Sequence, residues 1–189
     1  MDKINFTPFP VLKTERLILR CLEVSDDQQI FMLRSDNRVN QYLARPKQKD
    51  IKEIRAFINK INNGINNNEW IYWAITLKES PKLIGTICYW NFSNKKTVAE
   101  IGYELDPAFQ GNGIMSEAIK KIIEFGFQVI ELDTIEAYTH KKNNNSTKLL
   151  QKYNFEQDAD RIDKENSNNI IFTLTKQNWM DLKLSTTKH

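Results

Sequence analysis

A pair of glycines directly before an amphipathic stretch is the feature of this sequence with the clearest chemical meaning. Gly111 and Gly113 lie in the segment Glu100–Ile119, which reads EIGYELDPAFQGNGIMSEAI. Glycine allows a tight turn and a close approach of the backbone to a ligand. Because apolar residues recur at helical spacing after Gly113, unpaired N–H groups and the positive end of a helix dipole should face this turn. The sequence therefore predicts an anion-binding loop, with phosphate as the expected ligand.

The residues around the glycines argue against two common kinds of phosphate site. Ile114 and Met115 follow the second glycine, where a nucleoside-triphosphate loop carries lysine and serine or threonine. No third glycine stands at the spacing of a dinucleotide fingerprint. A glycine pair that merely begins a helix is the alternative interpretation of these two residues alone.

Two carboxylates precede the glycines and are candidates for acid–base chemistry. In KTVAEIGYEL (Lys96–Leu105), the period of a strand places Glu100 and Glu104 on one face, and Ile101 and Leu105 on the other. A general base needs such a carboxylate near the reacting group. A half-exposed sheet carboxylate paired with a lysine is an equally good interpretation of Glu100.

Alternating and helical patterns predict the elements that position these residues. Strands are expected at Arg16–Glu23, Trp70–Leu77, Leu83–Phe92, Lys96–Leu105 and Thr134–His140, with a final hairpin from Phe155–Asp163 and Asn169–Trp179. Helices are expected from Ser25, as N-cap, through Ser35, over Lys49–Asn63 with Gly64 as the stop, from Gly111 to about Val129, and over Ser146–Tyr153. A strand–helix–strand unit thus follows an antiparallel meander.

Length and composition limit the classes of protein that fit. A chain of 189 residues predicts a single domain over residues 1–189, with a core at about 10–178 and a mobile tail at about 180–189. The balance of 27 basic and 24 acidic residues argues against a nucleic-acid partner. No apolar run suggests a signal peptide or a membrane span, so a cytoplasmic location is expected. The two cysteines have no metal-ligand spacing, and no metal site is predicted.

Several motifs in a consistent order carry a resemblance to a known family. The segment Gln110–Met115, preceded by EIGYELDP and followed by SEA, resembles the cofactor motif of the GNAT superfamily of N-acetyltransferases. It is most similar to the Rim-type branch, which includes ribosomal-protein alanine N-acetyltransferases. Three further segments agree with that branch: Thr14–Arg20 (TERLILR), Leu83–Ile87 (LIGTI) and Asn143–Phe155 (NNNSTKLLQKYNF). The resemblance spans residues 10 to 175 and implies an α/β (α+β) fold, with a mixed twisted sheet of about six to seven strands flanked by about four helices.

The resemblance also implies how acetyl-CoA, the co-substrate, is bound. The pyrophosphate would lie on the loop formed by Gln110, Gly111, Asn112, Gly113, Ile114 and Met115. The N–H group near Leu105 would hold the oxyanion, and the pantetheine arm would add to the strand edge there and contact Asn143. Two residues depart from the family pattern, since Met115 replaces a glycine or alanine and Asn154 replaces a glycine.

Two further residues are the candidates for the chemistry. Glu100 is the expected general base, acting directly or through a water molecule. Ser146 is the expected proton donor to the departing thiolate, with Tyr153 or a water molecule as alternatives, because a leucine, Leu150, stands where many family members carry tyrosine. A serine near the start of a helix can also be simply an N-cap.

Together these features predict an enzyme that transfers acetyl from acetyl-CoA to a primary amine without a metal. The acceptor would be the N-terminal amine of a protein, as in the Rim-type enzymes, or a small molecule such as a polyamine, amino sugar, amino acid or drug. A non-catalytic acyl-CoA sensor is the rival from another class. The expected assembly is a monomer or a homodimer.

Overall fold

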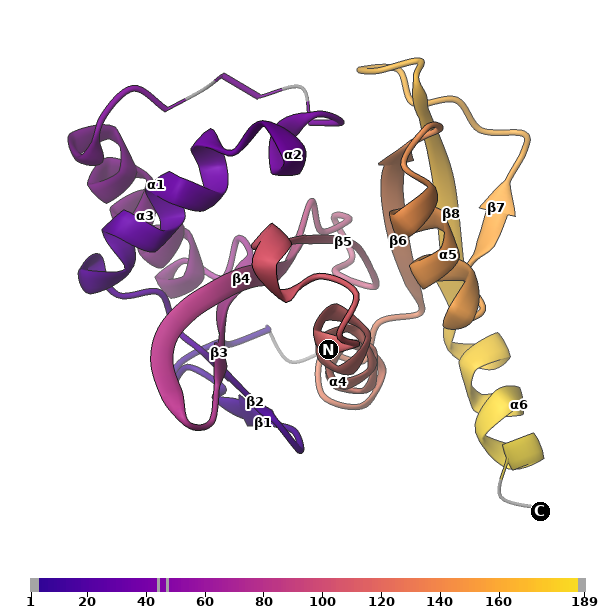
Figure 1. Cartoon of the computed structure of the whole chain (residues 1–189). Helices are drawn as coiled ribbons and strands as arrows, with labels where there is room; N and C mark the ends of the chain where they lie inside the picture. Colours follow the sequence, from indigo (N-terminus) through magenta and orange to yellow (C-terminus); the bar gives the residue numbers. More distant parts are fainter. Residues whose placement is uncertain (1–3, 44, 47, 187–189) are drawn as a thin grey trace. The chain divides into compact units, whose positions relative to one another are not determined.

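The structure is a computed structural model of the chain, and it describes residues 4–43, 45–46 and 48–186. These residues form two compact units (Figure 1). Unit 1 contains the described residues of Met1–Trp90 and Gly102–Lys121, and unit 2 contains those of Asn91–Ile101 and Ile122–His189. The strand β5 (Val98–Leu105) and the helix α4 (Ile114–Gln128) each begin in one unit and end in the other.

Unit 1 is built on an antiparallel meander. Its first four strands pair in chain order: β1 (Leu12–Lys13), β2 (Leu17–Arg20), β3 (Ile71–Leu77) and β4 (Ser80–Trp90). Along β2 the burial alternates, so Leu17 and Leu19 are fully buried while Ile18 and Arg20 are half-buried. This alternation follows from the two-residue period of a strand. The inner face of the meander therefore forms the core of this unit.

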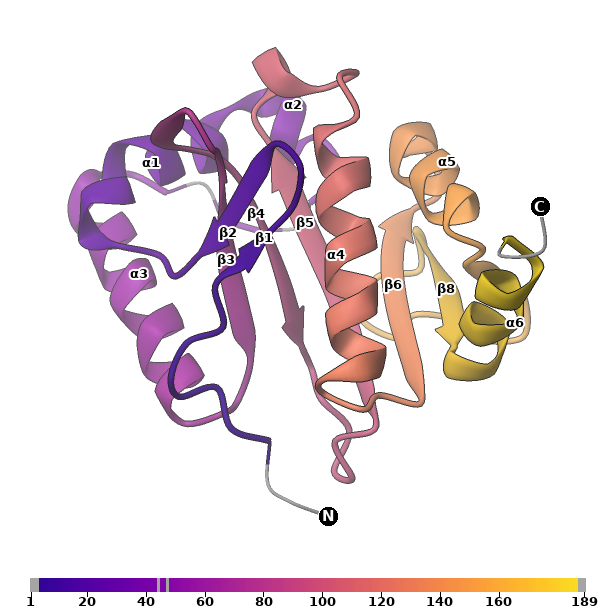
Figure 2. The same cartoon turned by 90° about the horizontal axis from the view of Figure 1, so that it is seen from below.

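Helices α1 (Asp27–Ser35), α2 (Asn37–Asn40) and α3 (Ile51–Asn66) complete unit 1. Figure 2 shows α1 and α3 side by side, and they pack against β4 and β3 respectively. Ile54, Ile58 and Ile61 give α3 its buried stripe, at the spacing of one helix face. The side chain of Asp50 caps α3 by accepting a hydrogen bond from the Glu53 N–H.

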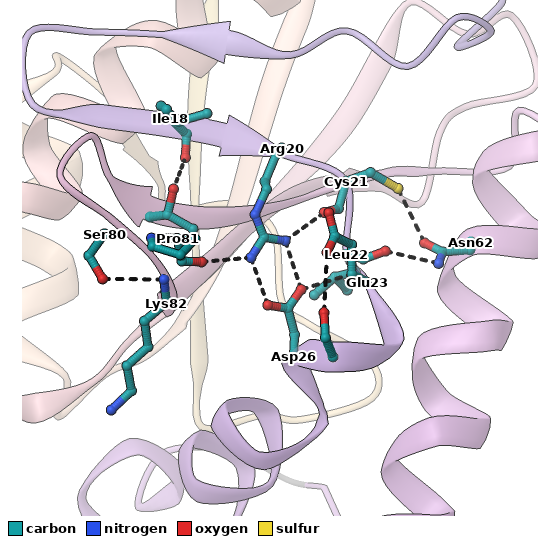
Figure 3. Close-up of polar contacts among 12 residues, drawn as sticks. Ile18, Arg20, Cys21, Leu22, Glu23, Asp26, Asn62, Ser80, Pro81 and Lys82 are labelled. Carbon is teal, nitrogen blue, oxygen red and sulfur yellow. Dashed lines mark hydrogen bonds and ion pairs between the residues drawn. The ribbon is translucent and has the colours of Figure 1, made fainter.

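An arginine on β2 fastens the first helices to the meander (Figure 3). The Arg20 guanidinium donates to both carboxylate oxygens of Asp26, over 2.7 and 2.8 Å, and to the carbonyl oxygen of Pro81. Asp26 lies in a short 3-10 turn, Val24–Asp26, directly before α1. Because the Asp26 side chain is only 5% exposed, loss of Arg20 would leave a buried carboxylate without its partner.

Unit 2 contains the first part of β5 and three further strands. β5 pairs in parallel with β6 (Thr134–His140), and β6 pairs antiparallel with β8 (Asn169–Thr175), which pairs with β7 (Glu156–Asp158). The ladder between β5 and β6 has three residue pairs and ends at Glu100–Glu136.

Two helices follow the strands of unit 2, α5 (Asn144–Lys152) and α6 (Lys176–Thr186). The Trp179 ring of α6 packs on Phe127 at the end of α4, with 5.1 Å between ring centroids.

The predicted fold class is confirmed, because the described residues form a mixed α/β structure with eight strands and six α-helices. The counts exceed the prediction slightly, since β1, α2 and α6 were not expected. The predicted boundaries at Ser25 and Trp179 were wrong. Ser25 does not cap α1 but lies within the 3-10 turn, and Trp179 does not continue the last strand but belongs to α6.

Gly64 does not end the third helix as predicted, because α3 continues to Asn66. The reason is a tertiary contact. The Trp70 indole packs where a side chain at position 64 would lie, and its Nε1–H donates to the carbonyl oxygen of Ile61 over 2.9 Å. This glycine therefore serves close packing rather than helix termination.

Part of the predicted tail has regular structure. Residues 180–186 belong to α6, and residues 187–189 lie outside the described part of the chain. Among the described residues, no helix is both long enough and apolar enough to cross a lipid bilayer. The expected single domain and cytoplasmic location stay predictions.

Candidate active site

The glycine turn lies, as predicted, directly before the first turn of α4. Gly111 and Gly113 have φ angles of +77° and +74°, a region that is costly for residues with a Cβ atom. A Cβ atom added at Gly111 would have no heavy atom within 4 Å, so this backbone faces open space. The side chains of Ile114 and Met115 are buried, which leaves only their backbone N–H groups for a ligand. A left-handed turn open to a ligand and followed by a helix N-terminus suits a pyrophosphate.

Hydrogen bonds and an ion pair within unit 1 hold the backbone of this turn in place. Arg16 donates through Nη1 to the carbonyl oxygen of Asn112 over 3.0 Å and through Nε to Glu117 over 2.6 Å. Glu117, in the first turn of α4, also accepts from the hydroxyl group of Thr14. The Gln110 side chain donates to the carbonyl oxygen of Leu105 over 3.0 Å. The turn is thereby fixed to β5 and to the chain that enters β2.

Thr14, Arg16 and Glu117 were not among the predicted site residues. An arginine in the TERL segment and a glutamate in the first turn of a helix were visible in the sequence. Their pairing over 101 positions along the chain was not.

The end of β5 lies unusually close to β4 in unit 1. A Cβ atom added at Gly85 would come within 2.6 Å of the carbonyl oxygen of Glu104. The Asp106 N–H donates to the carbonyl oxygen of Ile84 over 2.8 Å, and the Leu105 side chain is buried. The backbone that carries the predicted Leu105 N–H group is therefore held by β4 and by Gln110.

Glu100 lies at the last pair of the β5–β6 ladder in unit 2 and has a strongly shifted pKa. Burial raises the pKa of Glu100 from 4.5 to about 7, a hydrogen bond from Asn91 opposes the shift, and the negative charges of Glu136, Asp163 and Glu165 add to it. A carboxylate with a pKa near neutrality can take a proton from an ammonium group and later release it.

Arg161 neutralises the carboxylate next to Glu100 rather than Glu100 itself. Its two terminal nitrogens donate to the two oxygens of Glu136, and Nη2 also donates to the Tyr138 hydroxyl group over 2.9 Å. Burial and the neighbouring Glu136 raise the pKa of Tyr138 to about 12. Among the residues whose side chains the structure describes, no arginine or lysine forms an ion pair with Glu100.

Asn143 and Ser146 stand at the start of α5 in unit 2. The Asn143 side-chain oxygen accepts the Ser146 N–H over 3.2 Å, so Asn143 is the N-cap and Ser146 is the third helical residue. The alternative that Ser146 is itself the cap is therefore wrong. Leu150, one turn later on the same face, is fully buried, and Tyr153 is half-buried at the C-terminal end of the helix.

The predicted site residues thus fall into two sets. Unit 1 brings together Leu105 and Gln110–Met115, and unit 2 carries Glu100, Asn143 and Ser146. In the described part of the chain, no three His, Cys, Asp or Glu side chains are grouped closely enough to hold a metal ion.

A mixed sheet, and a helix that begins at an open glycine turn, define a domain suited to a phosphorylated co-substrate. Comparison with known proteins identifies which kind. The acetyltransferase (GNAT) domain family matches residues 16–156, and the chain belongs to this family. It is an acyl-CoA-dependent N-acetyltransferase, which confirms the family resemblance of its motifs.

Three similar proteins illustrate the range of the family. The uncharacterized N-acetyltransferase YoaA of Bacillus subtilis (strain 168) is 33% identical over 80% of this chain and 85% of its own length. The structure of RimL, a ribosomal L7/L12 alpha-N-protein acetyltransferase in complex with coenzyme A, matches 89% of this chain and 99% of its own, with a TM-score of 0.77 and 16% identity. The structure of FdhC, a nucleotide-linked sugar GNAT, matches 97% of this chain and 98% of its own, with a TM-score of 0.77 and 22% identity. These two structures share the fold with this chain.

Proposed function

We propose that this enzyme acetylates a primary amine by direct attack on acetyl-CoA, with Glu100 as the general base. The observation that carries the assignment is the pKa of about 7 that burial and negatively charged neighbours give to Glu100. An amine bound as ammonium must lose a proton before its nitrogen can attack. A base that is half ionised near pH 7 suits that step.

In this proposal the glycine turn binds the donor. The N–H groups from Gly111 to Met115 hold the pyrophosphate, because the turn is open and the helix dipole favours an anion there. The Leu105 N–H stabilises the oxyanion of the tetrahedral intermediate, and Asn143 contacts the pantetheine arm.

The acetyl transfer then needs no covalent enzyme intermediate. The amine nitrogen forms a bond to the thioester carbonyl carbon, and Glu100 accepts the proton lost from nitrogen. When the C–S bond breaks, the thiolate receives a proton, for which we propose the Ser146 hydroxyl group as donor, and the second proton that the nitrogen loses returns to the Ser146 oxygen. The cap of α5 is Asn143 rather than Ser146, and Ser146 lies in the first turn of that helix.

The acceptor is proposed only as a primary amine. Two proteins with this fold are described by their names as acting on a ribosomal protein and as a nucleotide-linked sugar enzyme. The fold therefore supports both a protein N-terminus and a small molecule.

Release of coenzyme A thiol across a panel of peptides and small amines tests the proposal. At least one amine should accelerate thiol release well above the rate without acceptor, with the amine recovered in N-acetylated form. A thermal shift on adding coenzyme A tests donor binding separately. Absence of stabilisation together with absence of turnover would refute the proposed function.

A further inference from the structure

A cluster of buried polar side chains in unit 1 lies outside the catalytic roles assigned above. We call it the arginine subsite, and it is formed by Arg34, Arg45, Tyr72, Thr86 and Glu104. These residues come from α1, the segment after α2, β3, β4 and β5. They approach one another from segments that lie far apart in the sequence, so the cluster depends on the tertiary fold.

Glu104 lies at the centre of this subsite and is the only carboxylate among its five residues. The Glu104 side chain is 7% exposed, and one of its oxygens lies 2.7 Å from Nη2 of Arg45. The other oxygen accepts a hydrogen bond from the Thr86 hydroxyl group, which also contacts the Tyr72 hydroxyl group over 2.9 Å. The Arg45 nitrogen is close enough for an ion pair but is not aligned for a hydrogen bond.

Arg34 adds a second positive charge without a second carboxylate. Its guanidinium lies over the Phe57 ring, 4.1 Å from the ring centroid. Its Nε atom is buried and has no hydrogen-bond partner among the described residues. Burial and the neighbouring Arg45 lower the pKa of Arg34, although an arginine stays protonated in proteins.

The charges of the arginine subsite therefore do not balance. Two arginines face one carboxylate: Nη2 of Arg45 lies 2.7 Å from the Glu104 carboxylate, whereas the buried Nε of Arg34 has no hydrogen-bond partner among the described residues. A buried charge and an unsatisfied buried donor both reduce stability unless a partner is supplied. A carboxylate or phosphate would supply the missing charge and accept these N–H groups in the geometry that guanidinium favours.

The position of Glu104 connects this subsite to the reaction. Glu104 directly precedes Leu105, whose N–H is the proposed oxyanion donor, and Gln110 of the glycine turn donates to the Leu105 carbonyl oxygen. We propose that the arginine subsite binds an anionic group of the acceptor, so that the substrate is a compact primary amine that also carries a carboxylate or a phosphate. This inference rests on the proposed acetyl transfer to an amine.

Matched acceptors test this substrate class with the full-length enzyme and acetyl-CoA. Glucosamine 6-phosphate is compared with glucosamine, and an α-amino acid with its amide, so that the two pairs separate a phosphate from a carboxylate. The anionic member of at least one pair should have a kcat/KM at least about tenfold higher, as expected for a charge-assisted contact. Equal or better use of neutral amines or of peptide N-termini would leave the proposed function intact and overturn this inference.

Variants then assign the preference to the subsite. Arg34→Gln should raise the KM of the anionic acceptor about tenfold and change the kcat/KM of the neutral acceptor much less. Arg34→Lys keeps the charge but loses the planar fork, so it should retain part of the preference. Arg38→Gln is the matched control, because Arg38 is 73% exposed and pairs with Asp36 outside the subsite. An equal loss for both members of a pair would show a structural role and overturn the inference.

Direct binding separates failure of the subsite from failure of the proposed function. Calorimetric titration with inorganic phosphate and with acetate should show binding of at least one anion to the wild-type protein, and this binding should be lost in Arg34→Gln and kept in Arg38→Gln. If no amine accepts acetyl, the proposed function fails, yet this binding pattern would still support an anion subsite. Binding that is absent, or unchanged in Arg34→Gln, would overturn the subsite itself.

Discussion

Charged side chains are paired with opposite charges near the glycine turn of unit 1, whereas like charges surround Glu100 of unit 2. Behind the turn, Arg16 pairs with Glu117 and with the carbonyl oxygen of Asn112. Around Glu100, three further carboxylates add negative charge, and Arg161 neutralises only Glu136. Charged groups that all have partners of opposite charge fix the backbone in one conformation. A buried carboxyl group near further negative charges has a raised pKa instead. The binding region is thus stabilised by its charges, while the proposed catalytic region is held at a cost to stability.

The largest expected effect comes from removing the shifted carboxylate. Glu100→Gln should reduce kcat/KM by about 10²–10⁴-fold, the usual contribution of a general base. The rise of kcat/KM with pH that reflects the pKa of about 7 should disappear as well. Steady-state rates from pH 5.5 to 9 measure both quantities.

Glu156→Gln provides the control for this variant, because Glu156 is an exposed carboxylate on β7 of the same unit. It should leave the rate and the pH profile unchanged. A Glu100→Gln enzyme that keeps the wild-type pH profile would show that another group is the base.

The next effect concerns the backbone of the glycine turn. Gly111→Val should raise the KM of acetyl-CoA about tenfold, because a left-handed conformation costs a residue with a Cβ atom about 1–2 kcal/mol. Gly111→Asn is the matched variant and should change this KM much less, since asparagine tolerates positive φ. The Cβ atom of either variant would have no heavy atom within 4 Å, so the two variants differ mainly in how well they tolerate positive φ. Equal KM values for the two variants would contradict a role for the backbone conformation.

The glycine turn and Glu100 also show how much of the site could be predicted from the sequence. The glycine turn depends on residues adjacent in the chain, so Gly111, Gly113 and the start of α4 were predicted directly. Strand alternation placed Glu100 and Glu104 on one face, and the family resemblance favoured Glu100. Its shifted pKa arises from burial and from carboxylates on β6 and after β7, which are distant in the sequence.

The wrong predictions have the same origin. Gly64 was expected to end the helix, whereas α3 continues to Asn66 and the Trp70 indole packs in the space that a side chain at position 64 would fill. The arginine subsite was missed because Arg34 and Arg45 meet Glu104 only in the folded unit. Local rules identify turns and caps, whereas burial and charge imbalance depend on distant residues.

A smaller effect is expected from the arginine behind the turn. Arg16→Gln removes an ion pair whose arginine is 45% exposed, and exposed pairs contribute only about 0.2–1 kcal/mol. The hydrogen bond to the Asn112 carbonyl oxygen is lost too, so the KM of acetyl-CoA should rise about threefold while kcat is kept. Arg38 is an exposed arginine on α2, and Arg38→Gln should leave the KM of acetyl-CoA unchanged. A fall in kcat alone would place Arg16 in the chemistry instead of in donor binding.

Opposite pH dependences of stability measure the contrast between the two regions directly. Burial alone would raise the pKa of Glu117, but hydrogen bonds from Thr14 and Arg16 hold it below the ordinary value. The folded state therefore binds fewer protons at Glu117 than the unfolded state, and this stabilisation is lost as the pH falls through the lowered pKa. Glu117→Gln should be less stable than the wild type at pH 7, with a difference that shrinks at acid pH.

Glu100 changes stability with pH in the opposite direction, because its pKa of about 7 in the folded state lies above its ordinary value of 4.5. The folded state holds the proton longer, so the wild-type protein loses stability as the pH rises from about 4.5 to 7. Glu100→Gln should therefore match the wild type near pH 4.5 and exceed its free energy of unfolding by about 1–3 kcal/mol at pH 8. Urea unfolding at four pH values measures both variants. The same sign of pH dependence in both would mean that the two regions do not differ in the way their charges are compensated.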